Sequence, residues 1–261
     1  MNSTRTVVVV MPAHNEAEGI AGFLEEIDGA LAATGTAADF VVVDDTSTDA
    51  TAERAEAAAV RGHVLVERNS RNRGHGPSAL RAYRAGLANG APVVVHVDGD
   101  GQYLGEAFPA LLDALGDGRV AHGIRDGRTD PWFRKALTGM VRVLVAAIAR
   151  GRVPDVNTPL RAYRADYLRH LLEQVPEDSL VPHVHFSILE RREREPVGTT
   201  VVLNIPRRGA SETGTMWGAQ KRPPRVPPRK LVSFARRALG EVVRIRIFGA
   251  RITQPASTAA D

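Results

Sequence analysis

The sequence lacks features that would mark a disulfide-rich, thiol-dependent or membrane-spanning protein. None of its 261 residues is cysteine, so disulfide bonds, a thiolate metal site and a cysteine nucleophile are excluded. No apolar run approaches the roughly 18 residues needed to span a bilayer. The N-terminal apolar run stops at Pro12, too early for a secretory signal. We expect a cytoplasmic protein with one large domain or two small ones.

Acidic residues are scarce in the C-terminal part of the chain. Residues 221–251 contain ten Lys or Arg and a single acid, Glu241, whereas the remainder has 24 basic and 29 acidic residues. The basic character therefore belongs to this segment, where contact with nucleic acid, contact with an anionic membrane surface or plain solvation could explain it. Because the segment has few aromatic side chains for stacking on bases, we expect no nucleic acid partner.

Apolar runs of strand length alternate with segments of helical periodicity. Buried strands are expected at 7–12, 40–45, 63–68, 91–102 and 119–124, with helices at 16–33, 49–60, 77–89 and 108–115. This alternation predicts an α/β fold with a mostly parallel sheet and helices on both faces. The second half is less regular: helices are expected at 134–150, 161–175 and 184–194, a strand at 199–206, a loop at 207–229 and a basic helix at 230–248.

Polar motifs follow three of these strands. P-A-H-N-E begins at Pro12, D-D-T-S-T-D at Asp44 and D-G-D-G-Q at Asp98. In open parallel sheets, ligands bind outside the carboxyl ends of the strands. The positions of the motifs therefore indicate a ligand site at one edge of the sheet.

The D-G-D-G-Q motif is a candidate metal site. Carboxylate and amide oxygens of Asp98, Asp100 and Gln102 could hold a divalent cation, which would neutralise the charge of a diphosphate. The glycines allow both carboxylates to face one space. An Asx-rich turn after a strand is the alternative interpretation.

The other motifs also have structural alternatives. One carboxylate of Asp44 and Asp45 is expected to cap the following helix, which leaves the other for a nucleobase or ribose. Asn15 is expected to cap the first helix. The loop at 69–77, which contains Gly74, precedes a helix, and a helix N-terminus favours an anion.

Several catalytic signatures are missing. The chain has neither a dinucleotide-binding G-x-G-x-x-G after its first strand nor a Walker A loop. It has no H-x-x-x-H pair on a helix and no G-x-S-x-G elbow. These absences disfavour a dehydrogenase and nucleophilic catalysis by Ser or His.

Taken together, the motifs resemble the family 2 glycosyltransferases of GT-A fold, and most closely the dolichyl-phosphate mannose synthase-like branch. The similarity covers roughly residues 5–210 and rests on VVVVMPAHNEAEGI, VVVDDTSTDAT, NRGHGPSALRAYRAGL, VVVHVDGDGQY, GIRDGRTDPWFRK and DVNTPLRAYRADYL. It implies a single GT-A domain at 1–210, followed by a loop and basic helix at 211–261.

The resemblance also implies site residues. A nucleoside-diphosphate sugar, UDP- or GDP-linked, would be bound by the ends of the first strands and the adjacent loops, and Mg²⁺ or Mn²⁺ by the aspartate motif. Arginines would contact the donor diphosphate and an acceptor phosphate. The donor set is Pro12, His14, Glu16, Asp44, Asp45, Gly74, Asp98 and Gly99; the metal set is Asp98, Asp100 and Gln102; the arginines are Arg125, Arg134, and Arg207 or Arg208.

Two departures from the family pattern are evident. His14 replaces the usual aromatic residue, and Thr46 replaces the common glycine of the D-D-G-S motif. The C-terminus lacks the pair of transmembrane segments found in several polyprenyl-phosphate enzymes, although the basic tail could lie on a membrane. We expect inverting transfer to a polyprenyl phosphate. A soluble hydroxyl acceptor is the alternative, with Asp155 as its candidate general base, although a turn or cap is the favoured role of Asp155.

Other classes and the oligomeric state stay open at this point. A sugar-nucleotide nucleotidyltransferase usually places a glycine- and arginine-rich loop after the first strand, where this chain has PAHNEAEG. A non-catalytic nucleotide- or RNA-binding protein would rely on the basic tail. A homodimer is compatible with the sequence.

Overall fold

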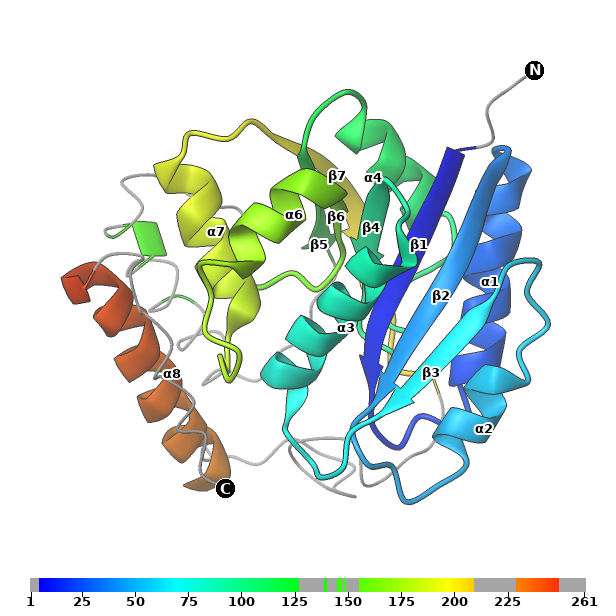
Figure 1. The fold of residues 1–261 in the computed structure, drawn as a ribbon, viewed down its shortest axis with the longest axis horizontal. Helices are drawn as coiled ribbons and strands as arrows, with labels where there is room; N and C mark the ends of the chain where they lie inside the picture. Colours follow the sequence, from blue (N-terminus) through cyan, green and yellow to red (C-terminus); the bar gives the residue numbers. More distant parts are fainter. Residues whose placement is uncertain are drawn as a thin grey trace, which may run out of the picture.

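The computed structural model describes residues 5–126, 155–208 and 229–248, together with residues 139, 145, 146 and 148. Its seven-stranded sheet has the order β3-β2-β1-β4-β6-β5-β7 (Figure 1). The strands are β1 (Arg5–Ala13), β2 (Thr36–Asp44), β3 (Val64–Arg68), β4 (Val93–His96), β5 (Val120–Asp126), β6 (Arg161–Arg164) and β7 (Val197–Leu203). Only β6 is antiparallel to its neighbours, β4 and β5.

Helices cover both faces of the sheet (Figure 1). Their bounds are α1 (Ile20–Ala33), α2 (Thr51–Glu56), α3 (His75–Asn89), α4 (Ala107–Leu115), α6 (Ala165–Leu172), α7 (Pro182–Arg192) and α8 (Arg229–Phe248). Side chains of α1, α2 and α4 belong to the core cluster on one face, and those of α3, α6 and α7 to the cluster on the other. The predicted α/β architecture is confirmed.

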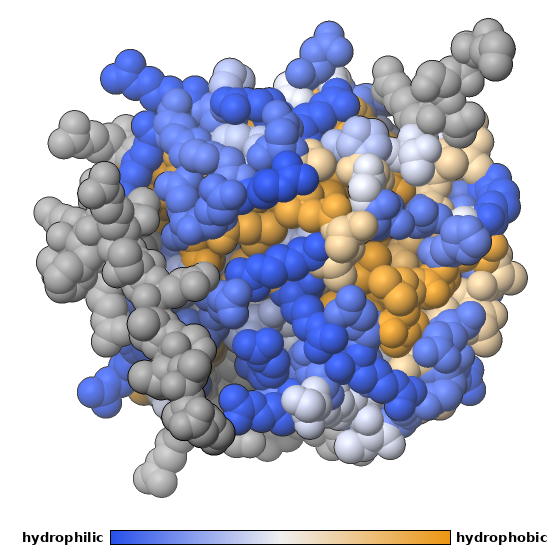
Figure 2. Space-filling view, viewed as in Figure 1, coloured by the Kyte–Doolittle hydropathy of each residue, from blue (hydrophilic) through white to orange (hydrophobic). Residues whose placement is uncertain are grey.

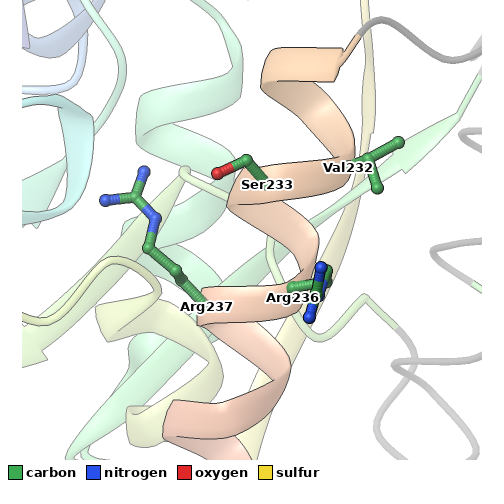
Figure 3. Close-up of a pocket in the computed structure, with 4 residues that line it drawn as sticks. All are labelled: Val232, Ser233, Arg236 and Arg237. Atoms are coloured by element: carbon green, nitrogen blue, oxygen red, sulfur yellow. The ribbon is translucent and has the colours of Figure 1, made fainter.

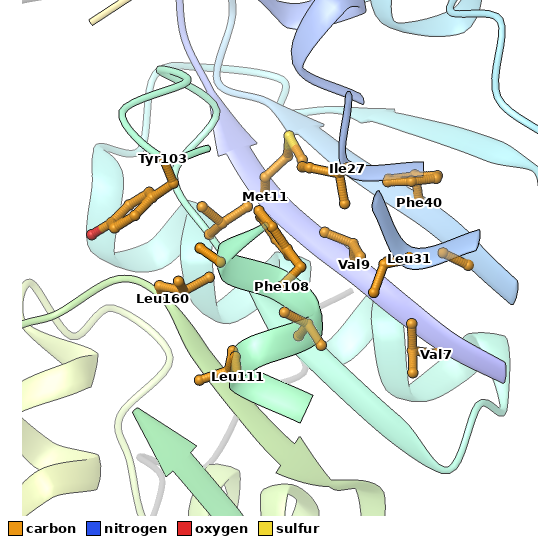
Figure 4. Packing of buried hydrophobic residues seen from close by; sticks show 14 of the residues in the cluster. Val7, Val9, Met11, Ile27, Leu31, Phe40, Tyr103, Phe108, Leu111 and Leu160 are labelled. Carbon is orange, nitrogen blue, oxygen red and sulfur yellow. The ribbon is translucent and has the colours of Figure 1, made fainter. Parts of the chain in front are cut away.

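Strand β1 shows why the valine run forms a central strand. Val7 and Val9 face the cluster of α1 and α4, whereas Val8 and Val10 face the cluster of α3. Each of the four is at most 2% exposed, because a parallel strand with helices on both sides buries both of its faces. Figure 4 shows the first of these clusters, where Phe108 of α4 packs against β1.

The segment 161–175 differs from expectation. The sequence predicts a single helix there, but Arg161–Arg164 forms β6 and the helix α6 begins only at Ala165. The backbone of β6 completes the hydrogen bonding of two strands, β4 and β5. This tertiary pairing outweighs the local helical pattern. The expected helix at 134–150 falls largely outside the described residues; positions 139, 145, 146 and 148 are helical.

Helix α8 packs beside α7 (Figure 1). Its Val242 is 3% exposed and joins a third cluster with Val184 and Ile188 of α7. Polar residues cover most of the face shown in Figure 2, and apolar residues emerge in a band near its centre. In the described part of the chain, none of the helices combines enough length and apolarity to cross a bilayer.

Candidate active site

The ends of β1, β2 and β4 bring three predicted motifs to one edge of the sheet. Ala13 pairs with Asp44 across β1 and β2, and the Asp45 N–H donates to the Ala13 carbonyl over 2.9 Å. The Gly99 N–H donates to the Pro12 carbonyl over 3.1 Å. A Cβ at Gly99 would lie 3.0 Å from that same oxygen, so glycine lets the loop after β4 pass close to β1.

Asp98 and Asp100 form a close pair of carboxylates in this loop. Oδ1 of Asp98 is buried without a hydrogen-bond partner among the described residues, and the Nε2 atom of His75 lies 3.5 Å from it. Burial, and then the charge of Asp98, raise the pKa of Asp100 to about 6. Two neighbouring carboxylates, one with an oxygen that accepts no hydrogen bond from the described residues, fit a divalent cation bound through carboxylates.

The carboxylate pair would supply only part of a metal's coordination shell. Among the described residues, no three His, Asp or Glu side chains are grouped to hold a metal ion. Mg²⁺ is commonly held by one or two carboxylates together with substrate phosphates. The Nε2 atom of Gln102 donates to the Ile205 carbonyl over 3.2 Å, which fixes the orientation of this third candidate ligand. The residues therefore fit a metal that binds together with a diphosphate.

Both acids at the end of β2 have structural partners. Asp45 accepts hydrogen bonds from the backbone N–H groups of Arg73 and Gly74, each over 2.8 Å, and from Nδ2 of Asn69 over 2.7 Å. It thereby fixes the glycine-rich loop before α3. Oδ1 of Asp44 accepts from the backbone N–H and the hydroxyl of Ser47. Of the two carboxylates, Asp45 accepts hydrogen bonds from more residues than Asp44 does.

The turn after β1 is tied to the turn after β2. Oδ1 of Asn15 accepts the Thr48 N–H over 2.8 Å, and α1 begins only at Ile20. The prediction that Asn15 caps the first helix is therefore wrong, because its side chain joins two loops. The ring of His14 is held by the Asp45 carbonyl, 2.9 Å from its Nδ1, at the edge of this paired turn.

Glu16 and Arg207 form an ion pair at the same edge of the sheet. Nε of Arg207 lies 3.0 Å from Oε2 of Glu16, and a second guanidinium nitrogen contacts Oε1. Burial and the charge of Asp100 raise the pKa of Glu16 and oppose its ionisation, whereas the charge of Arg207 and its hydrogen bonds favour the ionised form that the contact geometry shows. Asp100 and Arg207 are thus within electrostatic reach of each other.

Arg125 is engaged by a second ion pair. Its Nε and one terminal nitrogen donate to the two carboxylate oxygens of Asp155 over 2.7 and 2.9 Å, and it also reaches the Asn157 carbonyl. Both side chains are largely buried. Asp155 therefore holds an arginine beside the carboxylate loop. Arg134, the other arginine proposed for phosphate contact, lies outside the described residues.

Arg208 contacts the loop of the aspartate motif directly. Residues 204–208, called the strap here, follow β7 and run along this loop. The Ile205 N–H donates to the Gln102 carbonyl over 3.0 Å, and the Arg208 N–H to the Asp100 carbonyl over 3.1 Å. Nε of Arg208 donates to the Gly101 carbonyl over 3.0 Å. The strap therefore closes one side of the site.

Three residues near the site were not singled out from the sequence. His75 begins α3 and lies beside Asp98. Glu26 of α1 contacts Arg208. Arg161 is fully buried and donates to the carbonyls of Val156 and Thr158. The position of His75 inside the glycine-rich loop was a usable signal, whereas nothing in the local pattern marks the other two.

Comparison with known proteins agrees with this geometry. Residues 8–172 match the model of Glycosyl transferase family 2. The undecaprenyl-phosphate 4-deoxy-4-formamido-L-arabinose transferase of Edwardsiella ictaluri is 30% identical over 193 residues, which cover 73% of this chain and 59% of the relative. The dolichol-phosphate mannosyltransferase of Pyrococcus furiosus is 30% identical over 188 residues, covering 70% and 51%. The chain thus spans little more than half of these relatives.

Solved structures show the same fold. Glucosyl-3-phosphoglycerate synthase from Mycobacterium tuberculosis superposes with a TM-score of 0.64 at 19% identity, covering 93% of this chain and 80% of that one. The fold, the three motifs at the strand ends and the match over 8–172 lead to one conclusion: this chain belongs to glycosyl transferase family 2.

Proposed function

We propose that the chain transfers a sugar, with inversion, from a UDP- or GDP-linked donor to a polyprenyl phosphate. The observation that carries this proposal is the partly buried carboxylate pair of Asp98 and Asp100 within electrostatic reach of the cation Arg207. Carboxylates that suit a metal and an arginine that suits phosphate together match a diphosphate leaving group. Both relatives described above carry polyprenyl phosphates in their names, which supports the choice of acceptor.

In this proposal the site residues divide the work between donor and acceptor. Asp98, Asp100 and Gln102 would hold Mg²⁺ or Mn²⁺, which would neutralise charge on the departing diphosphate. Some neighbours of the same fold were crystallised with Mn²⁺ and UDP, which supports a divalent metal. Pro12, His14, Glu16, Asp44, Asp45, Gly74 and Gly99 would line the nucleoside-diphosphate side.

The state of Asp155 favours a phosphate acceptor over a neutral hydroxyl. A hydroxyl acceptor needs a base that removes its proton, whereas a phosphate is already ionised. Both oxygens of Asp155 accept hydrogen bonds from Arg125, so this carboxylate is poorly placed to take a proton. A soluble hydroxyl acceptor remains the second candidate.

The deciding experiment compares acceptors with and without a phosphate group. Wild-type protein with Mn²⁺ would be given UDP-, GDP- and dTDP-sugars together with a polyprenyl phosphate, the matching uncharged polyprenol or a soluble hydroxyl compound, and products would be identified by mass spectrometry. We expect product with the phosphate only, and none in excess chelator. Transfer to a soluble hydroxyl compound but not to the phosphate would replace the proposal with its alternative.

We also propose that α8 lies on an anionic membrane surface, which would bring the site to a lipid acceptor. Six of its seven charged residues are basic. The single acid, Glu241, is turned into the protein, where it accepts from the Leu180 N–H over 3.0 Å and contacts His185. Exposed Arg236 and Arg237 line a pocket of ≈ 560 Å³ along the helix, with Val232 and Ser233 (Figure 3). Basic residues at such a surface contribute about 1 kcal/mol each.

A further inference from the structure

Arg208 connects the strap to the loop that carries the metal-binding carboxylates. Its backbone N–H donates a hydrogen bond to the Asp100 carbonyl. Its Nε donates to the Gly101 carbonyl, and a terminal nitrogen donates to the Tyr103 carbonyl over 3.0 Å. Three carbonyls within four consecutive residues of this loop are therefore held by one arginine. Its side chain is only 24% exposed.

Helix α1 holds this arginine from the other side. The remaining guanidinium nitrogen of Arg208 contacts Oε2 of Glu26, and the guanidinium carbon lies 5.3 Å from the ring centre of Phe23. The other oxygen of Glu26 accepts the Gly105 N–H over 2.6 Å. Glu26 thus anchors both Arg208 and the far end of the loop to a helix of the core.

Two glycines leave the space that Arg208 occupies. A Cβ at Gly101 would lie 2.7 Å from Cδ of Arg208, and a Cβ at Gly19 would lie 2.9 Å from its Cβ. Gly101 also has φ +66°, a conformation in which glycine is strongly favoured. The loop is therefore shaped around this side chain, and the second glycine of D-G-D-G-Q has an assigned purpose.

We propose that Arg208 is a positioning residue: it fixes the peptides of residues 100–103, so that Asp98 and Asp100 are held ready for the metal, and it does not itself bind phosphate. Each nitrogen of its guanidinium group contacts Gly101, Tyr103 or Glu26, so the group is directed at the loop and α1. This inference rests on the proposed metal-dependent function and assigns a supporting residue within the same site.

Arg207 is the matched contrast to Arg208. It belongs to the same strap, but its guanidinium group contacts Glu16 at the nucleoside edge, and within the described part of the chain it donates to no carbonyl of the loop. Of the two adjacent arginines, Arg207 is thus the one assigned to the anionic substrate. A change at each position should affect a different binding constant.

The test measures Mn²⁺ binding by electron paramagnetic resonance at saturating nucleoside diphosphate, without turnover. Arg208→Met keeps the aliphatic stem, Arg208→Lys keeps the charge, Arg207→Met removes the neighbouring charge, and exposed Arg169→Met on α6 is the control. Loss of a residue that orients metal ligands typically weakens metal affinity by about 10–100-fold. We expect this loss in both Arg208 variants, since lysine is a single point of donation and cannot span the three acceptors. Arg207→Met should bind the nucleoside diphosphate less tightly, whereas Arg169→Met should bind both the nucleoside diphosphate and Mn²⁺ as the wild type does.

Each outcome separates this inference from the proposed function. If wild-type protein binds no Mn²⁺, the metal-dependent function fails. If wild type binds Mn²⁺ and Arg208→Met binds it equally well, or if Arg208→Lys restores full affinity, the positioning role is wrong. Should Arg208→Met fail to fold, Glu26→Gln leaves the arginine in place and weakens its anchor, and unchanged Mn²⁺ affinity in that variant would overturn the inference.

Discussion

Asp100 lies where burial and the neighbouring Asp98 both oppose its negative charge. Its folded-state pKa of about 6 exceeds the ordinary value of 3.8, so folding favours the neutral carboxyl group. The folded protein is therefore most stable with respect to this group below pH 3.8, and that stability is lost as the pH rises through about 6. At pH 8 the ionised carboxylate should cost about 1–3 kcal/mol. Asp100→Asn removes this charge and should be the more stable protein at pH 8, while losing Mn²⁺ binding and transfer.

Urea denaturation of Asp100→Asn and wild type in chelator provides the measurement. The stability gap should open between pH 4 and pH 8 in favour of the variant. A gap of the same size at both pH values would mean that the carboxylate carries no burial cost, and full transfer activity in the variant would remove Asp100 from the metal site.

Thr46 occupies a backbone conformation that suits other residues better. Its φ is +59°, which is unfavourable for a β-branched side chain and common for asparagine. Strain of this kind costs on the order of 1–3 kcal/mol. Thr46→Asn should therefore raise the melting temperature, whereas Thr46→Val, which keeps the branch and loses the hydroxyl bond to the Asp45 carbonyl, should lower it. Calorimetry that finds both variants less stable would show that the threonine is unstrained.

At the scale of elements, three histidines are buried where β4, β5 and α7 contribute to the core. His96, His122 and His183 are each at most 2% exposed, and burial lowers the pKa of each, that of His96 to about 4. In the unfolded chain these histidines take up a proton near pH 6.5, whereas in the folded protein they stay neutral to a lower pH. Their contribution to stability is therefore full above pH 6.5 and is lost as the pH falls toward about 4.

Chemical denaturation from pH 7.5 to 4.5 should therefore show a steep loss of stability in acid. Nδ1 of His96 donates to the Pro159 carbonyl over 2.7 Å, and an asparagine amide can donate in its place. His96→Asn should be less stable than wild type at pH 7.5 but should lose less stability in acid. A variant with the same pH slope as wild type would contradict this assignment.

Strands and helices were predictable from the sequence to different degrees. The valine runs of β1, β2 and β4 were recognised because strands buried on both faces are apolar throughout. Strand β6 was missed because RAYR has no such run. Arg161 is charged and yet 0% exposed, since its guanidinium group is taken up by backbone carbonyls, Tyr163 and Ser187. A strand of this kind forms because of its pairing with β4 and β5 in the folded protein, and its own sequence does not predict it.

The residues of the candidate site were also predictable from the sequence to different degrees. Asp98 and Asp100 were identified because their motif directly follows a strand. The division of labour between Arg207 and Arg208 was not predictable, since their partners Glu16 and Glu26 lie more than 180 residues earlier. Adjacent residues with the same side chain differ only in what the tertiary fold places opposite them.

At the scale of the whole molecule, α8 presents the exposed basic residues Arg236 and Arg237. Charge reversal by Arg236→Glu with Arg237→Glu should weaken sedimentation with vesicles that contain anionic lipid, and added salt should weaken it in wild type as well. Exposed Arg54 and Arg169 provide the control, because reversing both changes the net charge equally on other helices. Equal losses in the two double variants would mean that net charge, not α8, governs vesicle binding.

The strap comes from residues 204–208, whereas the carboxylates that it organises lie at 98–100. A ribosome adds about 5–20 residues per second, so Asp100 is translated roughly 5–20 seconds before Arg208. Until then the nascent polypeptide carries both aspartates but no arginine to shape their loop. On the inference that Arg208 shapes this loop, the proposed metal site would take its final form only after translation has passed β7.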